Sequence, residues 1–201
     1  MCLVKIKKIF NEIYLEMLSN KDYLIELDQK FGDGDLGLSM VEGFNGVNEY
    51  IKTVENIDSY PKFFHKISLL FNESAPSSLG TIISYFIMGI AKSLKKYDVI
   101  NEEILINSMD EGLEYLKEKV KTKMGEKTII DSLEPAIKKL IETKNIDEAI
   151  KAAKEGVDKT KEMIAVHGRA AYHKEKTIGY IDGGAYVAYL IFIGIKKGGI
   201  L

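Results

Sequence analysis

Apolar side chains recur every three or four residues along almost the entire chain, and this spacing constrains the fold more than any other feature. The first run places Ile6, Ile9, Phe10 and Ile13 on one side of a helix. No stretch alternates apolar and polar residues over any length, as a half-buried strand would. Only three prolines occur, so long helices can continue unbroken. The sequence therefore predicts an all-α fold of about eight amphipathic helices with short connections, most of them between antiparallel neighbours.

Length and charge narrow the class of protein. A chain of 201 residues with 46% hydrophobic and 29% charged residues is typical of one globular domain, here residues 1–201. The net charge of -2 argues against a nucleic-acid partner, and the single cysteine, Cys2, excludes an internal disulfide. The most apolar window, 186–195, is about half as long as a bilayer span, and the N-terminus lacks the apolar core of a signal peptide. We therefore expect no membrane partner and a cytoplasmic protein.

The stretch 27–37, referred to below as the acidic turn, is the most informative for function. It holds three carboxylates, Asp28, Asp33 and Asp35, and three glycines that favour a tight turn. Converging carboxylates repel one another unless a cation lies between them. Because no Cys or His is among them, the oxygen-only set suits a hard cation, Mg²⁺ or Ca²⁺. A solvated acidic turn is the alternative.

The spacing of the carboxylates along the sequence distinguishes a Ca²⁺ loop from a Mg²⁺ site. An EF-hand loop needs oxygen ligands at positions 1, 3 and 5 and a glutamate at position 12. Counted from Asp33, position 5 is Gly37 and position 12 is Phe44; counted from Asp28, position 3 is Lys30. Neither count fits, so the remaining interpretation is Mg²⁺ completed by waters and phosphates.

Two further stretches suit phosphate groups. The helix expected to begin within 36–39 offers unpaired N–H groups and partial positive charge beside the acidic turn. The Ser-rich stretch 72–81 opens another helix and has either the same use or the ordinary role of a connection capped by Ser77 or Ser78.

A long irregular connection, 168–185, is expected before the last helix. Such connections are often functional. It contains Arg169, whose planar fork of donors suits phosphate, and Asp182 before two glycines. A surface ion pair is the alternative for Arg169. We expect His65, His167 and His173 at the surface.

Three stretches, 27–37, Gly125–Ile129 and 168–185, carry a resemblance in their joint order and spacing. They resemble the nucleotide-binding (L) subunit of dihydroxyacetone kinase. That family pattern runs Leu-Asp, Gly-Asp-Gly-Asp-His-Gly, a Gly-Ala-Ser-Gly loop, Gly-Asp-Lys-Thr-Met, Gly-Arg-Ala-Ser-Tyr and Asp-Pro-Gly-Ala. The resemblance covers essentially the whole chain, and the joint order of the motifs is more specific than any one of them.

The resemblance implies a single-domain barrel of eight antiparallel helices that binds ADP or ATP and Mg²⁺ at one end. By matching, Asp28, Asp33 and Asp35 would hold two Mg²⁺ ions that bridge the phosphates. The residues that would line the nucleotide are Leu36, Gly37, Leu38, Ser39, Ser74, Ala75, Gly125, Ile129, Arg169, Asp182, Gly183 and Gly184. No residue of this chain is expected to act as a catalytic nucleophile.

The family also implies partners. A K subunit holds dihydroxyacetone through a histidine, so the substrate would not lie on this chain. One branch of the family uses ATP directly, and the other keeps ADP tightly bound and has it rephosphorylated by an M subunit of the phosphotransferase system. A free-standing L chain of this length resembles the second branch.

Departures from the pattern leave alternatives open. Leu36 stands where the family has histidine, Gly183 where it has proline and Ile129 where it has methionine, and the stretch 72–79 contains no glycine. A second hypothesis is therefore a non-catalytic nucleotide- and metal-binding module that acts as a sensor or a partner-binding regulator. A relation to the nucleotide-binding part of fatty-acid kinases ranks last, because it requires additional domains.

Overall fold

The computed structural model describes residues 3–199, so Cys2 lies outside the described part. Helices dominate it, and no strand occurs between residues 3 and 199. The α-helices are α1 (Leu3–Ser19), α2 (Lys21–Gln29), α3 (Leu36–Thr53), α4 (Tyr60–Ser74), α5 (Ser78–Ser93), α6 (Glu102–Val120), α7 (Ile130–Thr143), α8 (Ile146–Lys159) and α9 (Gly183–Gly198). Short 3₁₀ segments cover Leu94–Lys96, Thr160–Glu162 and Arg169–Thr177.

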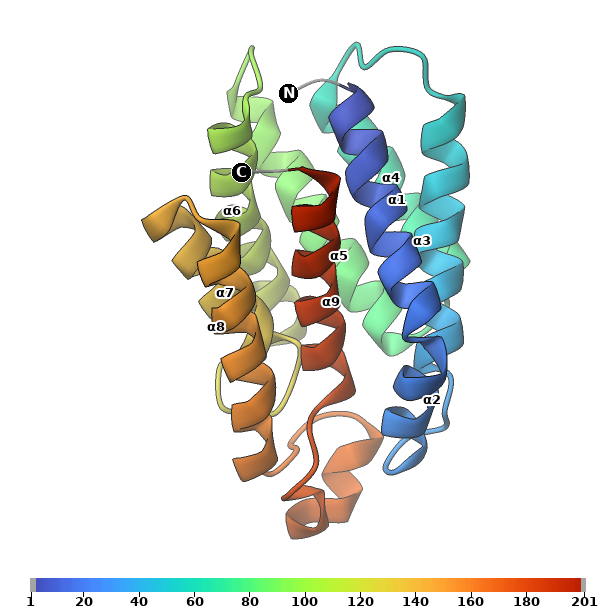
Figure 1. The fold of residues 1–201 in the computed structure, drawn as a ribbon, viewed down its shortest axis with the longest axis vertical. Helices are drawn as coiled ribbons and strands as arrows, with labels where there is room; N and C mark the ends of the chain where they lie inside the picture. Colours follow the sequence, from blue (N-terminus) through green and yellow to red (C-terminus); the bar gives the residue numbers. More distant parts are fainter. Residues whose placement is uncertain (1–2, 200–201) are drawn as a thin grey trace.

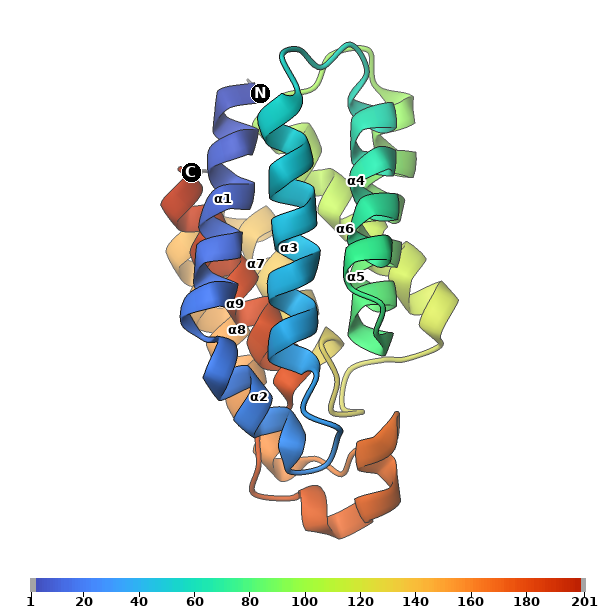
Figure 2. The same cartoon turned by 90° about the vertical axis from the view of Figure 1, so that its right-hand side faces the viewer.

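The helices form a closed ring. Helices α1 and α2 are one helical run broken at Asn20, and α1 packs against α3. From α3 onward each helix packs against the next, and α9 packs against both α8 and α1 (Figures 1 and 2). Neighbours alternate in direction around the ring. The predicted barrel of about eight antiparallel helices is confirmed.

Four connections meet at one end of the barrel, the lower end in Figures 1 and 2. They are the turns and loops 30–35, 75–77, 121–129 and 160–182. The first residues of α1 and the last residues of α9 lie toward the opposite end of the molecule. The alternating direction of the helices therefore gathers every stretch singled out in the sequence at one end.

Side-chain caps set several helix starts. Ser59, Ser77, Asn101 and Asn145 each accept a hydrogen bond from a backbone N–H of the helix that follows. Because α4 extends to Ser74 and Ser77 caps α5, the predicted loop 72–81 shrinks to residues 75–77. At the start of α2, Asn20 holds the cap position without a side-chain hydrogen bond.

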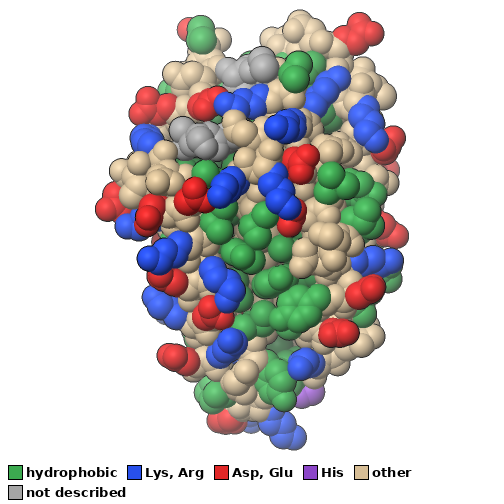
Figure 3. Space-filling view, viewed as in Figure 1, with side chains coloured by type: hydrophobic (Ala, Val, Ile, Leu, Met, Phe, Trp, Pro, Cys, Tyr) green, Lys and Arg blue, Asp and Glu red, His purple; other side chains and the backbone are tan. Residues whose placement is uncertain are grey.

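The last helix is central, as its apolar sequence predicts. Phe192, Val187 and Ala188 of α9 are fully buried. On the face shown in Figure 3, hydrophobic side chains gather over α9, with lysines and carboxylates around them. Tyr186 and Tyr189 of α9 are partly buried and pack against the core. None of the helices between residues 3 and 199 combines the length and the hydropathy that a membrane crossing demands.

Candidate functional site

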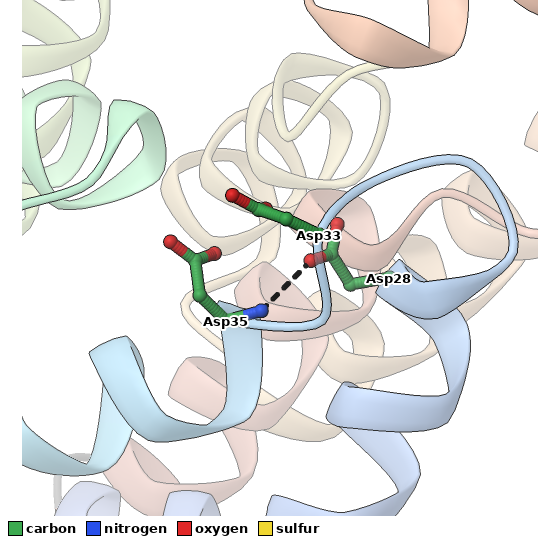
Figure 4. A group of neighbouring side chains, drawn as sticks. All are labelled: Asp28, Asp33 and Asp35. Atoms are coloured by element: carbon green, nitrogen blue, oxygen red, sulfur yellow. Dashed lines mark hydrogen bonds between the residues drawn. The ribbon is translucent and has the colours of Figure 1, made fainter.

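The acidic turn folds around the carboxylate of Asp28, at the end of α2. Asp28 Oδ2 accepts hydrogen bonds from the backbone N–H of Gly34 (2.7 Å) and of Asp35 (3.1 Å). Gly34 has a φ of 77°, a left-handed conformation that suits glycine. Asp35 is the N-cap residue of α3. As Figure 4 shows, Asp28, Asp33 and Asp35 converge, and one carboxylate oxygen of each lies within 4.8 Å of the other two.

Charge at this cluster is unbalanced. The pKa of Asp35 is raised, first by burial and then by the neighbouring carboxylates of Asp33 and Asp28. Arg169, from the loop 160–182, forms an ion pair with Asp33 and lowers the pKa of Asp35. The Arg169 side chain is 65% exposed, so this pair stabilises the fold little. Three oxygen ligands with open coordination positions suit a hard divalent cation that keeps waters or binds phosphate oxygens.

The start of α3 lies beside the cluster. Leu38 is exposed, whereas Leu36 and Ser39 are buried. Leu36 lies against Gly183, at the start of α9, and Ser39 Oγ lies 2.6 Å from Ser77 Oγ, the cap of α5. The sequence did not place Ser77 among the lining residues, although its position before a helix is a signal for a capping hydroxyl.

Three other predicted lining residues lie at close helix contacts. Gly37 faces the backbone of Lys21, so no side chain fits there. Ser74, the last residue of α4, lies against Gly46 of α3. Ala75 is fully buried. Their observed role is to let helices approach one another at this end of the barrel.

The loop 121–129 is held by Asp131, a residue that the sequence analysis missed. Asp131 Oδ1 accepts from the N–H of Gly125 (2.5 Å), and its Oδ2 accepts from the N–H of Thr128 (2.8 Å). Gly125 is exposed with a φ of 89°, and Ile129 is buried beside Gly184. The available signal was a carboxylate in the first turn of a helix, where unpaired N–H groups lie.

The same loop contacts the loop 160–182 through Glu126. His167 Nε2 lies 2.7 Å from Glu126 Oε2, which also accepts from Thr122 Oγ1 (3.0 Å) and from the N–H of Lys123 (3.1 Å). The hydrogen bond with His167 contributes most to lowering the pKa of Glu126 to about 2. His167 is exposed, as predicted, yet it joins the two loops.

Aromatic contacts join the acidic turn to the loop 160–182. Phe31 lies between His173 and Tyr180, with ring centroids 5.1 and 5.3 Å away. Lys30 Nζ lies 4.6 Å from the centroid of the Tyr180 ring. These contacts fix the distance between the carboxylate cluster and the loop that carries Arg169.

Asp182 ends the long loop as the N-cap of α9. Its Oδ2 accepts from the N–H of Ala185 (2.7 Å), and its own N–H donates to Thr160 Oγ1 (2.9 Å). Burial raises the pKa of Asp182 to about 6; the Ala185 bond lowers it, and the nearby Asp131 raises it further. The group is therefore half-protonated near pH 6.

This raised pKa predicts a pH dependence of stability in Mg²⁺-free buffer. Between its ordinary value of 3.8 and about 6, folded Asp182 holds a proton that the unfolded chain has released. Its contribution to the free energy of unfolding is therefore complete below pH 3.8 and is lost as the pH rises through 6. Asparagine at position 182 keeps a helix cap but cannot ionise. Between pH 4 and pH 7 we therefore expect the free energy of unfolding of Asp182→Asn, measured in urea, to rise by up to about 3 kcal/mol relative to that of wild type.

The control is the same substitution at Asp147, an exposed aspartate in the first turn of α8. The difference between Asp147→Asn and wild type should change less over the same pH range. A constant difference between Asp182→Asn and wild type from pH 4 to pH 7 would contradict the assignment of the raised pKa.

A model of the DAK2 domain matches residues 30–197 of the chain. The ADP-binding subunit DhaL of the PEP-dependent dihydroxyacetone kinase 1 of Listeria innocua is 30% identical over 182 residues, which cover 90% of this chain and 89% of that protein. The ADP-binding subunit DhaL of the PTS-dependent dihydroxyacetone kinase of Lactococcus lactis is 29% identical over 91% of this chain and 89% of its own length.

Longer relatives contain the match as a part. Dihydroxyacetone kinase 1 of Saccharomyces cerevisiae is 30% identical over 78% of this chain, and the match covers 28% of that protein. The crystal structure of the dihydroxyacetone kinase of C. freundii in complex with AMP-PNP and Mg²⁺ superimposes with a TM-score of 0.77 and 22% identity. That match covers 94% of this chain and 32% of the other, and at this identity it shows a shared fold.

Proposed function

The chain belongs to the DAK2 domain family, and from this premise we propose that it is the nucleotide-binding subunit of a dihydroxyacetone kinase. In this proposal residues 1–201 form one domain that binds ADP or ATP with Mg²⁺ at the end of the barrel where the four connections meet. The observation that carries the proposal is the convergence of three carboxylates within 4.8 Å at that end.

The donor set fits magnesium. Asp28, Asp33 and Asp35 supply oxygen ligands on one side and leave the other side for water and phosphate oxygens. We propose that they hold two ions, as the resemblance implies. Bound Mg²⁺ would supply neutralisation of the phosphate charge, which phosphoryl transfer needs more than covalent help from the protein.

The remaining lining residues act by position. Arg169 stands beside the carboxylate cluster with most of its side chain exposed, and in this proposal its guanidinium turns from Asp33 toward a phosphate. The proposed lining residues are the set predicted from the sequence: Leu36, Gly37, Leu38, Ser39, Ser74, Ala75, Gly125, Ile129, Arg169, Asp182, Gly183 and Gly184. Those of them that are buried shape the wall behind the surface that the nucleotide would touch.

The phosphoryl group would pass to dihydroxyacetone held by a separate K subunit. The two bacterial relatives are named PEP-dependent and PTS-dependent kinases, and this chain spans 89% of each. We therefore propose that ADP stays bound and is rephosphorylated by a phosphotransferase-system M subunit.

Calorimetry with ADP and Mg²⁺ tests the binding step. A ligand present at 100 times its Kd stabilises the folded state by about 2.7 kcal/mol, which corresponds to a rise in Tm of about 5–10 °C for a chain of this size. We expect this rise with ADP and Mg²⁺ together and little with ADP alone. Absence of heat and of a Tm shift at millimolar Mg²⁺-ADP would refute the proposal.

A second candidate function is a non-catalytic sensor or partner-binding regulator. It is favoured by Leu36, which is buried where the family has a polar histidine, and by the glycine-free connection 75–77. Phosphoryl transfer to dihydroxyacetone by the purified chain with K and M partners distinguishes the two. Transfer rules out the regulator, whereas nucleotide binding without transfer favours it.

A further inference from the structure

Lys127 is a buried cation that the proposed phosphoryl transfer does not use. It lies in the loop 121–129 and is only 5% exposed. Its ammonium donates to three backbone carbonyls at short distance: Tyr180 O at 2.6 Å, and Thr160 O and Thr177 O at 2.7 Å. A fourth carbonyl, Met163 O, lies at 3.3 Å. All four acceptors belong to the loop 160–182.

The surroundings of this ammonium resemble those of a dehydrated monovalent cation, because neutral carbonyl oxygens replace its water. Burial lowers the pKa of Lys127, and the nearby carboxylate of Asp182 raises it. Without the ammonium, the buried carbonyls would lose a hydrogen-bond donor that water does not easily replace. The lysine therefore stabilises one particular arrangement of the four carbonyls.

Those carbonyls lie near the start of the loop and near its end. Thr160 follows α8 directly, and its hydroxyl accepts the N–H of Asp182. Tyr180 packs against Phe31 of the acidic turn. Arg169 lies between these anchor points and reaches Asp33. The ammonium thus ties together both ends of the segment that presents Arg169.

The backbone of Lys127 is held in an unfavourable conformation. Its φ is 58°, the left-handed region that favours glycine. Two residues earlier the chain places Gly125 in the same region with a φ of 89°. A lysine in a strained conformation persists where the surrounding structure over-determines it, and here the four carbonyls do so.

We propose that Lys127 is a positioning residue, whose ammonium holds the loop 160–182 so that Arg169 and Asp182 face the nucleotide. The proposal rests on the proposed nucleotide site for its effect on binding. Its effect on the loop is independent of any ligand. Lys127 does not touch the nucleotide in this arrangement, since its ammonium is directed to the loop carbonyls.

The test compares Lys127→Met with Lys121→Met. Both variants remove one positive charge from a left-handed residue, since Lys121 has a φ of 52°, but Lys121 is exposed. Methionine preserves the length and packing of the lysine stem. We expect backbone amides in 161–182 to exchange hydrogen at least about tenfold faster in Lys127→Met and Mg²⁺-ADP affinity to fall about 10–100-fold, as for other residues that orient a site. Lys121→Met should match wild type in both measurements.

Chemical rescue separates the charge from the bulk of the side chain. In Lys127→Ala, propylammonium supplies the three carbons and the ammonium that the substitution removes. We expect propylammonium to restore slow exchange in 161–182 and Mg²⁺-ADP affinity, and tetramethylammonium at equal concentration to restore neither. An alanine variant that propylammonium does not improve, whether folded or not, would overturn the proposal.

The remaining outcomes keep this inference distinct from the proposed function. A Lys127→Met protein with wild-type exchange and wild-type Mg²⁺-ADP affinity refutes the role of Lys127 and leaves the nucleotide site standing. If wild-type protein binds no Mg²⁺-ADP, the proposed function fails, and the exchange rates of 161–182 still decide whether Lys127 holds the loop.

Discussion

Replacing Asp33 by asparagine is expected to weaken Mg²⁺-dependent ADP binding by at least about 100-fold. Asp33 would be a direct ligand, and even residues that only orient a metal ligand cost about 10–100-fold when they are mutated. The substitution removes a charge at nearly constant size, and Asp33 is exposed, so the helices should remain intact. Titration calorimetry with ADP in saturating Mg²⁺ measures the change.

Without Mg²⁺, the same substitution should raise the stability of the protein or leave it unchanged. Two carboxylate oxygens within 4.8 Å of each other repel by about 1 kcal/mol in a water-like dielectric, and Asp33 has two such neighbours. The exposed pair with Arg169 contributes 0 to about 1 kcal/mol, so its loss does not outweigh the relief of repulsion. Asp33→Asn is therefore expected to melt at or above the wild-type Tm without Mg²⁺ and below it with Mg²⁺-ADP.

Asp110→Asn provides the matched control, because Asp110 lies on α6 in an ion pair with Lys138, away from the acidic turn. It should leave Mg²⁺-ADP affinity unchanged. If Asp33→Asn binds Mg²⁺-ADP as wild type does, the acidic turn is not the metal site.

Replacing Gly194 by alanine should destabilise the fold by about 3 kcal/mol, the upper end of the range for overpacking. A Cβ at Gly194 of α9 would lie 2.6 Å from the Cα and 2.7 Å from the backbone N of Ile13 in α1. Backbone atoms do not move aside as a flexible side chain does, so α9 and α1 would separate where the ring closes. For a chain of this size the Tm should fall by about 6–12 °C.

Gly46→Ala is the corresponding control in α3. A Cβ there would lie 2.1 Å from Ser74 Oγ, which can rotate away, and 2.8 Å from Ser74 Cβ, which requires a small shift. Because no backbone atom is in the way and alanine favours a helix by about 1 kcal/mol over glycine, its Tm should fall less than that of Gly194→Ala. A Gly194→Ala protein with an unchanged Tm would show that α1 and α9 approach less closely than the structure indicates.

The fold could be predicted because the signal for each helix lies within that helix and recurs along the chain. Each helix carries its own apolar spacing, and residues such as Ser59 and Asn101 mark helix starts. The alternative that Ser77 or Ser78 caps the helix after the Ser-rich stretch is confirmed for Ser77, although α5 then takes up much of the stretch 72–81 that was expected as a loop. Tertiary contact, through Ala75 packed beneath Gly80, shortens that connection to three residues.

The site could be predicted only in part. Turn chemistry placed the carboxylates of the acidic turn together, because Asp28 folds a sequence-local loop around itself. Asp131 escaped the sequence analysis, and Lys127 was included only as part of the stretch Gly125–Ile129. The contacts of both could not be predicted, because their partners are backbone groups that no side-chain motif records. The link between His167 and Glu126 spans 41 positions and has no local signature.

The contact between Leu36 and Gly183 joins two of the departures from the family pattern. A Cβ at Gly183 would lie 2.6 Å from Leu36 Cδ2. Gly183 is the first residue of α9, a position where proline is otherwise favourable. The leucine and the glycine thus pack as a pair: a side chain or a proline ring at position 183 requires the end of the Leu36 side chain to move. Any redesign that moves this barrel toward its relatives should therefore exchange residue 36 on α3 before, or together with, residue 183 at the start of α9.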